Sequence, residues 1–194
     1  MRTRLRRHAR RIKVIVYQET LFDYKEHFWT FLGAFVGIAL VGLMNRYRLP
    51  ATDAPLLIGS FGASSVLIYG VINSPLAQPR NLLGGHVLSA IIGVTMQRWI
   101  PHEMWLSGAL AVSLSIVGMQ VTKTLHPPGG ATALIAIIGS PQLKALGYWY
   151  VLTPVLTGVL VLLGVALLFN NITTTRRYPA NKNWYRFWLR KYEG

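Results

Sequence analysis

Six apolar runs, separated by short polar or glycine- and proline-rich segments, constrain the fold of this chain more than any other feature. The runs cover residues 28–44, 55–72, 82–99, 104–121, 129–139 and 148–170. A helix needs about 20 apolar residues to cross the hydrocarbon core of a bilayer, with a range of about 17–25. Residues 129–139 are too short to cross alone, whereas the other runs are near this length. The sequence therefore predicts an all-α, polytopic membrane helix bundle.

The charged residues lie mainly outside these runs. Lys and Arg number 20 against 6 Asp and Glu, so the formal net charge is +14 although only 13% of residues are charged. A nucleic-acid binder of this charge would carry basic residues over a folded face, and a disordered chain would lack the 52% hydrophobic content. We therefore expect no nucleic-acid partner. The absence of cysteine excludes thiolate metal sites and cysteine nucleophiles, and we expect no metal and no cofactor.

The distribution of basic residues predicts the orientation. Residues 2–13 hold seven basic residues and residues 176–191 hold six. With six crossings, both tails would share one side with Lys25, Arg80 and Lys123, which gives that side 16 of the 20 basic residues. Basic residues are enriched on the cytoplasmic side of membrane proteins. We therefore expect a multi-pass protein with both termini in the cytoplasm, in a bacterial inner membrane, with anionic lipid bound at the basic tails.

Two similar halves are visible in the sequence. Residues 62–64 (GAS) resemble residues 130–132 (GAT), and residues 87–90 resemble residues 155–158, in both cases 68 positions later. Each half has three apolar runs, and tandem copies with an odd number of crossings must be inverted, which is a common plan of transporters. We expect residues 1–27 to form a basic tail and an interfacial amphipathic helix. Residues 28–99 and 102–170 would be the two repeats, followed by a basic aromatic tail at 171–194.

The middle run of each half is interrupted. In the second half, residues 123–132 read KTLHPPGGAT, and the two prolines prevent a continuous helix. In the first half, residues 59–65 read GSFGASS and predict a milder break. Half-helices that begin inside the membrane direct N–H groups and a positive dipole end into the protein, which favours an anion. The candidate substrate-binding residues are Lys123, Thr124, His126, Gly129, Gly130 and Thr132 in one half, and Ser60, Gly62, Ser64 and Ser65 in the other.

Structural interpretations of these residues stay open. His126 could brace a turn through a backbone hydrogen bond, Lys123 could extend to the membrane surface, and the hydroxyls could support helix packing. Gln78, Arg80, Asn81 and His86 form a candidate pore mouth. Arg80 could instead serve orientation and Asn81 could cap a helix. Asp53 is expected to be structural, as a cap or as a partner of Arg46 or Arg48.

These blocks resemble the HPP family of integral membrane proteins, which is named for the His-Pro-Pro motif. The resemblance rests on residues 123–133 (KTLHPPGGATA), 60–64 (SFGAS), 75–81 (PLAQPRN) and 84–86 (GGH), and it extends over about residues 29–179. Some members from cyanobacteria and plastids are implicated in nitrite transport. The resemblance therefore implies a transporter or channel-like permease for a small inorganic anion, with nitrite the first candidate.

Two other functions compete with transport. A membrane scaffold would use the basic tails to bind lipid or a partner. A membrane enzyme would need a base, a nucleophile or a metal site, and the histidines show no metal-ligand spacing. We therefore expect no enzymatic activity. The small residues on the helices are compatible with a homo-oligomer.

Overall fold

The structure, a computed structural model, describes residues 24–46 and 49–180. Within these ranges the chain contains α-helices and short 3-10 or π-helical segments, and no strand. The elements are α2 (Tyr24–Arg46), α3 (Ala54–Ser65), η1 (Val66–Gly70), η2 (Pro75–Ala77), α4 (Pro79–Trp99), α5 (Met104–Val121), α6 (Pro128–Ile138), α7 (Pro141–Ala145), η3 (Val151–Leu156) and α8 (Thr157–Phe169). The all-α prediction is confirmed for this part of the chain. The amphipathic helix expected before α2 and the end of the C-terminal tail lie outside the described residues.

Three of the described helices are long and apolar enough to cross a membrane, namely Tyr24–Arg46, Met104–Val121 and Val151–Phe169. Two shorter apolar helices, Ala54–Gly70 and Pro128–Ile138, accompany them. α4 has 21 residues, but its polar positions include Arg80, His86 and Arg98. Each apolar run of the sequence contains a helix, and the expected total of six crossings stays a prediction.

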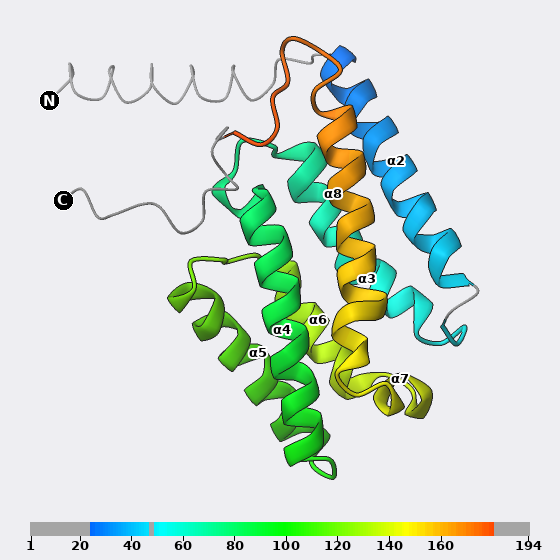
Figure 1. The fold of residues 1–194 in the computed structure, drawn as a ribbon, viewed down its shortest axis with the longest axis vertical. Helices are drawn as coiled ribbons and strands as arrows, with labels where there is room; N and C mark the ends of the chain where they lie inside the picture. Colours follow the sequence, from blue (N-terminus) through cyan, green and yellow to red (C-terminus); the bar gives the residue numbers. More distant parts are fainter. Residues whose placement is uncertain (1–23, 47–48, 181–194) are drawn as a thin grey trace, which may run out of the picture.

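Successive long helices run in alternating directions (Figure 1). We call one end of the bundle the terminal end. There the first turn of α2 contacts the segment after α8, because Arg176 Nη1 donates to Glu26 Oε2 over 3.1 Å. The opposite end, the far end, is closed by Asp53, whose carboxylate accepts from the backbone N–H of Ser140 over 2.8 Å. Because Asp53 precedes α3 and Ser140 follows α6, these two helices run in opposite directions.

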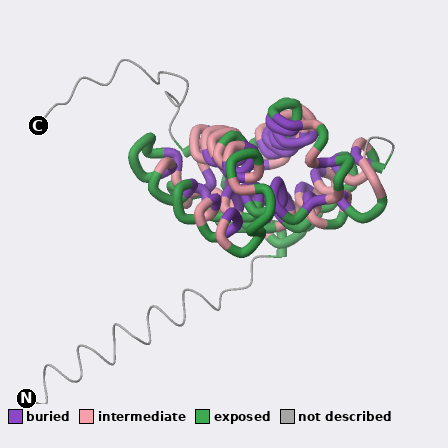
Figure 2. The backbone as a smooth tube through the Cα atoms, turned by 90° about the horizontal axis from the view of Figure 1, so that it is seen from below, coloured by how far each residue is buried: buried purple, intermediate pink, exposed green. Residues whose placement is uncertain are grey.

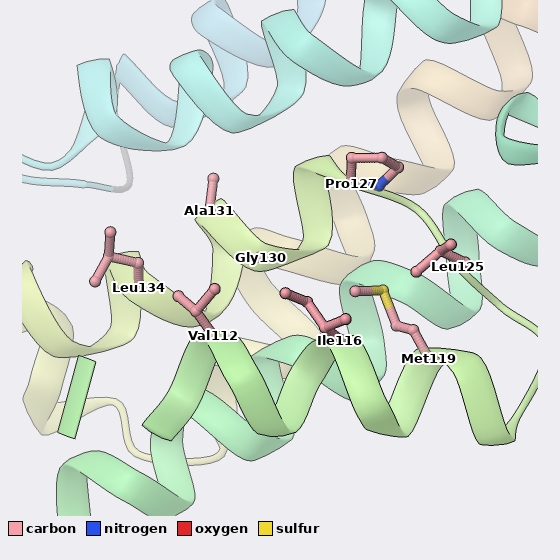
Figure 3. A pocket seen from close by; sticks show the side chains of 8 residues that line it. All are labelled: Val112, Ile116, Met119, Leu125, Pro127, Gly130, Ala131 and Leu134. Carbon is pink, nitrogen blue, oxygen red and sulfur yellow. The ribbon is translucent and has the colours of Figure 1, made fainter. Parts of the chain in front are cut away.

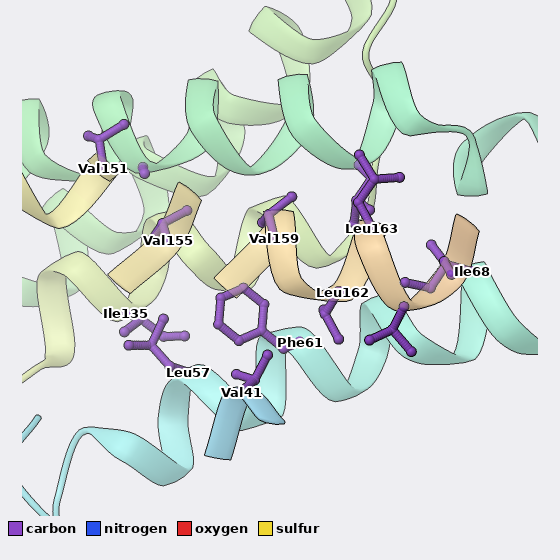
Figure 4. Close-up of a cluster of buried hydrophobic side chains, with 14 of the residues drawn as sticks. Val41, Leu57, Phe61, Ile68, Ile135, Val151, Val155, Val159, Leu162 and Leu163 are labelled. Carbon is purple, nitrogen blue, oxygen red and sulfur yellow. The ribbon is translucent and has the colours of Figure 1, made fainter. Parts of the chain in front are cut away.

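The main hydrophobic core lies between α3 and α8 (Figure 4). The ring of Phe61 on α3 is fully buried and faces Val155 of η3 and Val159 of α8. A β-carbon at Gly158 would lie 2.6 Å from ring carbons of Phe61, so the ring needs a glycine at this position. Buried residues gather between the helices and exposed residues line the outer surface (Figure 2). Many of the exposed residues are large and apolar, as expected for helices that face lipid.

The break expected in the first half is wrong. α3 is helical from Ala54 to Ser65 and continues directly into the π-helical segment η1. The stretch contains no proline. The Ser65 hydroxyl donates to the Phe61 carbonyl and the Ser64 hydroxyl lies 3.2 Å from the Ser60 carbonyl, in each case four residues earlier, as is common for serine within a helix. The serines and glycines of residues 59–65 therefore lie in the middle of a helix and not at a helix N-terminus.

The break in the second half is confirmed. Residues 122–127 are not helical, and α6 begins at Pro128. Lys123 ends the preceding turn with a φ of +56°, in the left-handed region. A further break, which the sequence analysis did not predict, lies at Thr153, whose φ of −138° and ψ of 123° are extended. Pro154 explains it, because proline disfavours helical geometry in the residue before it.

Arg176 connects the C-terminal segment to three helices at the terminal end. Its side chain is 4% exposed. Nη1 donates to Thr30 Oγ1 over 2.9 Å, and Nη2 donates to the Tyr69 carbonyl over 2.7 Å and to Asn170 Oδ1 over 2.8 Å. Two residues later, the buried Tyr178 hydroxyl donates to the Ala77 carbonyl over 2.6 Å. Burial raises the pKa of Tyr178, so this phenol stays a hydrogen-bond donor.

Candidate functional site

Three elements meet at the hydroxyl of Ser64 in the middle of the bundle. Ser64 lies on α3, His86 on α4, and His126 in the non-helical segment before α6. Ser64 Oγ is 2.8 Å from Nε2 of His86 and 2.9 Å from Nε2 of His126. The two imidazole rings have centroids 5.0 Å apart, and all three side chains are fully buried. The chain therefore places two imidazole rings within hydrogen-bond distance of one hydroxyl, away from solvent.

Two more hydroxyls extend this arrangement toward α6. Thr132 Oγ1 lies 2.7 Å from Nδ1 of His86 and 2.8 Å from Ser60 Oγ, and Ser60 also donates to the Pro128 carbonyl over 3.0 Å. The buried Tyr150 hydroxyl donates to the Thr132 carbonyl over 2.9 Å. We call Ser60, Ser64, His86, His126 and Thr132 the central cluster.

The second nitrogen of His126 anchors the non-helical segment. Nδ1 lies 2.9 Å from the carbonyl of Leu76, in η2. A carbonyl oxygen only accepts, so this ring nitrogen carries the proton. His126 therefore braces the segment through Nδ1, as the structural interpretation expected, and contacts the polar cluster through Nε2.

Glycines on α4 let the His-Pro-Pro segment approach this closely. A β-carbon at Gly85 would lie 2.5 Å from Cβ of His126, and one at Gly84 would lie 2.5 Å from a methyl carbon of Thr124. In return, a β-carbon at Gly129 would lie 2.8 Å from the carbonyl oxygen of Gly85. The contact between α4 and the start of α6 is therefore backbone against backbone, and side chains at these positions would separate the two histidines.

The N-terminus of α6 supplies the electrostatics of the site. α6 begins at Pro128 directly beside the central cluster, and Pro128, Gly129 and Thr132 are buried. A helix N-terminus carries a partial positive charge. Pro128 has no N–H, and the N–H groups of Gly129 and Gly130 donate to the carbonyls of His126 and Pro127, so the helix end contributes its dipole and no unpaired N–H group there. In the described residues, no group of three or more His, Cys, Asp or Glu could hold a metal ion. The arrangement suits a small, negatively charged or polar guest better than a cation.

Some of the predicted residues lie away from the cluster. Ser65 donates to the carbonyl of Phe61 on its own helix, and a β-carbon at Gly62 would meet no atom within 4 Å. Lys123 is exposed at the end of α5. Thr124 is buried, but its hydroxyl lies 2.7 Å from that of Thr122. The structure thus brings together the side chains of four of the ten predicted substrate-binding residues, Ser60, Ser64, His126 and Thr132.

Gly130 lines a different feature, an open groove between α5 and α6 (Figure 3). The groove has a volume of about 480 Å³. Its lining is apolar and consists of Val112, Ile116, Met119, Leu125, Pro127, Gly130, Ala131 and Leu134. The side chains of this lining offer an anion no hydrogen bonds, so we do not equate the groove with the predicted anion-binding site.

The predicted pore-mouth residues brace backbone segments. Arg80 Nη2 donates to the Thr122 carbonyl over 2.6 Å, and Asn81 Nδ2 donates to the Leu125 carbonyl over 2.8 Å. Gln78 occupies the N-cap position of α4 and donates to two carbonyls of the preceding turn. The interpretation of Asn81 as a cap is therefore wrong.

Two further expectations about polar residues need correction. The structure places His86 in the central cluster and not with Arg80 and Asn81. Its neighbours Gly84 and Gly85, two adjacent glycines inside a helix, were the available signal, because such a pair indicates close approach of another backbone. Asp53 has a structural role and occupies the N-cap position of α3, as expected, but its carboxylate does not cap the helix and instead accepts two hydrogen bonds from Ser140.

Comparison with known proteins agrees with these motifs. The family model described as the HPP transmembrane region matches residues 19–179. The chain belongs to the HPP transmembrane family. Both the central cluster and the non-helical segment of this HPP protein lie inside the matched region.

Two curated relatives from Dictyostelium discoideum are described as transmembrane proteins. One is 45% identical over 160 residues, which is 81% of this chain and 56% of the relative. The other is 43% identical over 161 residues, which is 81% of this chain and 51% of the relative. This HPP chain thus spans about half the length of these relatives. No solved structure matches it. The family and the apolar helices identify an integral membrane protein.

Proposed function

We propose that this protein is a transporter or channel-like permease for a small inorganic anion, with nitrite the first candidate substrate, and that it has no enzymatic activity. The observation that carries the proposal is the N-terminus of α6, which is buried beside the hydroxyls and imidazoles of the central cluster. Intramembrane ionisable residues are expensive to bury and commonly mark substrate or ion pathways. The proposed substrate approaches at the α6 N-terminus and the face of α3 that carries Ser60 and Ser64.

The proposed topology has six crossings with both termini in the cytoplasm. The alternating helix directions support it. Basic residues support it too, because the hydrogen bonds of Arg80, Arg176 and Tyr178 join the start of α4 and the end of α5 to the terminal end, which therefore holds Lys25, Arg80, Lys123, Arg176 and Arg177. The far end has Arg46, Arg98 and Lys144 among the described residues. The positive-inside rule then directs the terminal end, with both tails, to the cytoplasm, where the tails would bind anionic lipid.

The proposed architecture is a pair of inverted repeats. Its support is that α3 and α6 are antiparallel and touch at Ser60 and Pro128, which are 68 positions apart. The same separation relates residues 62–64 to residues 130–132. In a two-fold arrangement, equivalent residues contact each other only on the axis. The axis would therefore pass beside Ser60 and Pro128, which is where transporters of this plan hold their substrate.

A scaffold function is the competing candidate. It is favoured by the completeness of the cluster, because every hydroxyl and ring nitrogen in it has a hydrogen-bond partner within the protein. Such a network stabilises a bundle without any ligand. Transport requires that Ser60 or Thr132 exchange a protein partner for the substrate during the cycle.

Flux through liposomes that contain the purified full chain distinguishes the two candidates. The panel is nitrite, nitrate, formate, bicarbonate and chloride, each compared with protein-free liposomes of the same lipid. We expect nitrite to enter at least ten-fold faster with the protein. Thr132→Val and His126→Ala should abolish this difference.

The matched controls are residues outside the cluster. Ser113→Ala removes an exposed hydroxyl of α5 that bonds only to its own helix, and His102→Gln removes an exposed histidine in the loop after α4. Both should transport like the unmodified protein. If liposomes with the protein are no more permeable to any anion of the panel than protein-free liposomes, the transport function is rejected and the scaffold function becomes the favoured candidate.

A further inference from the structure

The hydrogen-bond partners of the central cluster assign its protons. His126 Nδ1 donates to the Leu76 carbonyl, so with a neutral ring its Nε2 must accept, and the one proton of the Ser64 hydroxyl goes there. Ser64 Oγ then accepts from Nε2–H of His86. Nδ1 of His86 in turn accepts from the Thr132 hydroxyl. The two neutral histidines are therefore opposite tautomers, joined through Ser64.

The same atoms accommodate one additional proton. If Nε2 of His126 becomes protonated, it donates to Ser64 Oγ, which has two lone pairs and then accepts from both histidines. The displaced hydroxyl proton of Ser64 turns to the Ser60 carbonyl, 3.2 Å away. Every donor keeps an acceptor in this second arrangement. A second added proton would place two imidazolium rings with centroids 5.0 Å apart in a buried site, and like charges at that distance repel.

The surroundings leave such a proton without a carboxylate. The sequences of α3, α5, α6 and α8 contain no acidic, basic or histidine residue. The other titratable side chains nearby are the phenols Tyr69, Tyr150 and Tyr178, and the cations Arg80, Arg98 and Lys123. The buried carboxylate of Asp53, which precedes α3, accepts from Ser140 at the far end and does not bond to the cluster. Phe61 lies against His86, with ring centroids 5.6 Å apart. A protonated pair is thus a single buried positive charge at the N-terminus of α6, and a monovalent anion is the natural counter-charge.

We infer that His86, Ser64 and His126 form a one-proton site, and that the protein moves one proton together with each monovalent anion. This inference rests on the proposed anion transport and adds its coupling ion. The proton binds Nε2 of His126, the Ser64 hydroxyl reorients toward the Ser60 carbonyl, and both changes reverse when the proton leaves. The loaded site is neutral overall, so transport is electroneutral.

The test measures the proton and the anion in the same liposomes. Purified full-length protein is reconstituted with an internal pH dye, and the membrane potential is clamped with potassium and valinomycin. We expect anion influx to acidify the lumen by one proton per anion, after subtraction of protein-free liposomes. The rate should be unchanged when the clamped potential is reversed. Because this stoichiometry is measured on the unmodified protein, it needs no variant that folds.

Variants then locate the proton. His86→Gln and His126→Gln, confirmed as monodisperse by size exclusion, should lower proton uptake at least ten-fold, whereas His102→Gln should not change it. Anion flux that carries current without proton uptake would overturn the coupling and leave transport intact. Proton coupling that persists in both glutamine variants would overturn the assigned site. The absence of any anion flux would instead reject the proposed function itself.

Discussion

Nε2 of His86 and Nε2 of His126 approach the same oxygen atom, the hydroxyl of Ser64, from two different elements. The two rings are inclined by 56° and belong to α4 and to the segment before α6. One serine on α3 therefore connects the histidine of the GGH motif with the histidine of the HPP motif. Substitutions at Thr132, Gly85, Arg176 and Asp53 test how this arrangement and the two ends of the bundle are held in place.

Thr132→Val removes one hydroxyl and keeps the shape of the side chain. Nδ1 of His86 would lose its partner, and the hydroxyl of Ser60 would keep only the Pro128 carbonyl. A buried polar group without a partner costs about 1–3 kcal/mol. We expect a loss of that size in the free energy of unfolding in detergent, measured by denaturant titration. Thr174→Val, at an exposed position after α8, should cost no more than about 0.5 kcal/mol. Equal losses for both variants would contradict the role of the cluster.

Gly85→Ala should separate α4 from the His-Pro-Pro segment. The new β-carbon would lie 2.5 Å from Cβ of His126 and 3.1 Å from the Thr124 carbonyl. Overpacking of this kind costs about 1–3 kcal/mol. Thermal unfolding in detergent should show a clear fall in the melting temperature. At Gly164 on α8 a β-carbon meets nothing within 4 Å, so Gly164→Ala should leave the melting temperature unchanged or raise it.

Arg176→Lys should loosen the terminal end. The guanidinium donates to groups of α2, η1 and the end of α8, and a lysine ammonium cannot reproduce this planar fork. Hydrogen bonds of charged groups are worth about 1.5–3 kcal/mol each. We expect faster amide hydrogen exchange in residues 24–30 and 170–178. The neighbouring Arg177 is exposed, so Arg177→Lys is the matched control and should exchange like the unmodified protein.

Asp53→Asn should loosen the far end. Asp53 is 1% exposed and its carboxylate accepts from both the backbone N–H and the hydroxyl of Ser140. The amide is neutral, so the two charge-assisted hydrogen bonds are replaced by neutral ones, which are weaker. Hydrogen exchange in residues 140–147 should increase while residues 24–30 stay unchanged. Glu103→Gln, at an exposed acid of the far end, provides the comparison, and identical exchange in the two variants would refute the role of Asp53.

The boundaries of the helices followed closely from the sequence where proline or charge marks them. α5 spans the predicted residues 104–121, and α6 starts beside the two prolines. The prediction failed in residues 59–65, where glycine and serine suggested a break. These residues tolerate a helix as readily as a loop, and α3 is kept helical by its packing against α6 and α8.

The sequence by itself determined that this is an all-helical membrane protein of the HPP transmembrane family, because apolar length, proline positions and short motifs are local properties of the chain. It also marked His126, Ser60, Ser64 and Thr132 as residues of interest. Only the tertiary structure decided that His86 joins them. The Gly84-Gly85 pair indicates that another backbone approaches α4, but the pair does not identify that backbone as the segment before α6. The distinction is physical: an apolar run needs only a bilayer to become a helix, whereas a buried hydrogen-bond network needs three separate elements to meet.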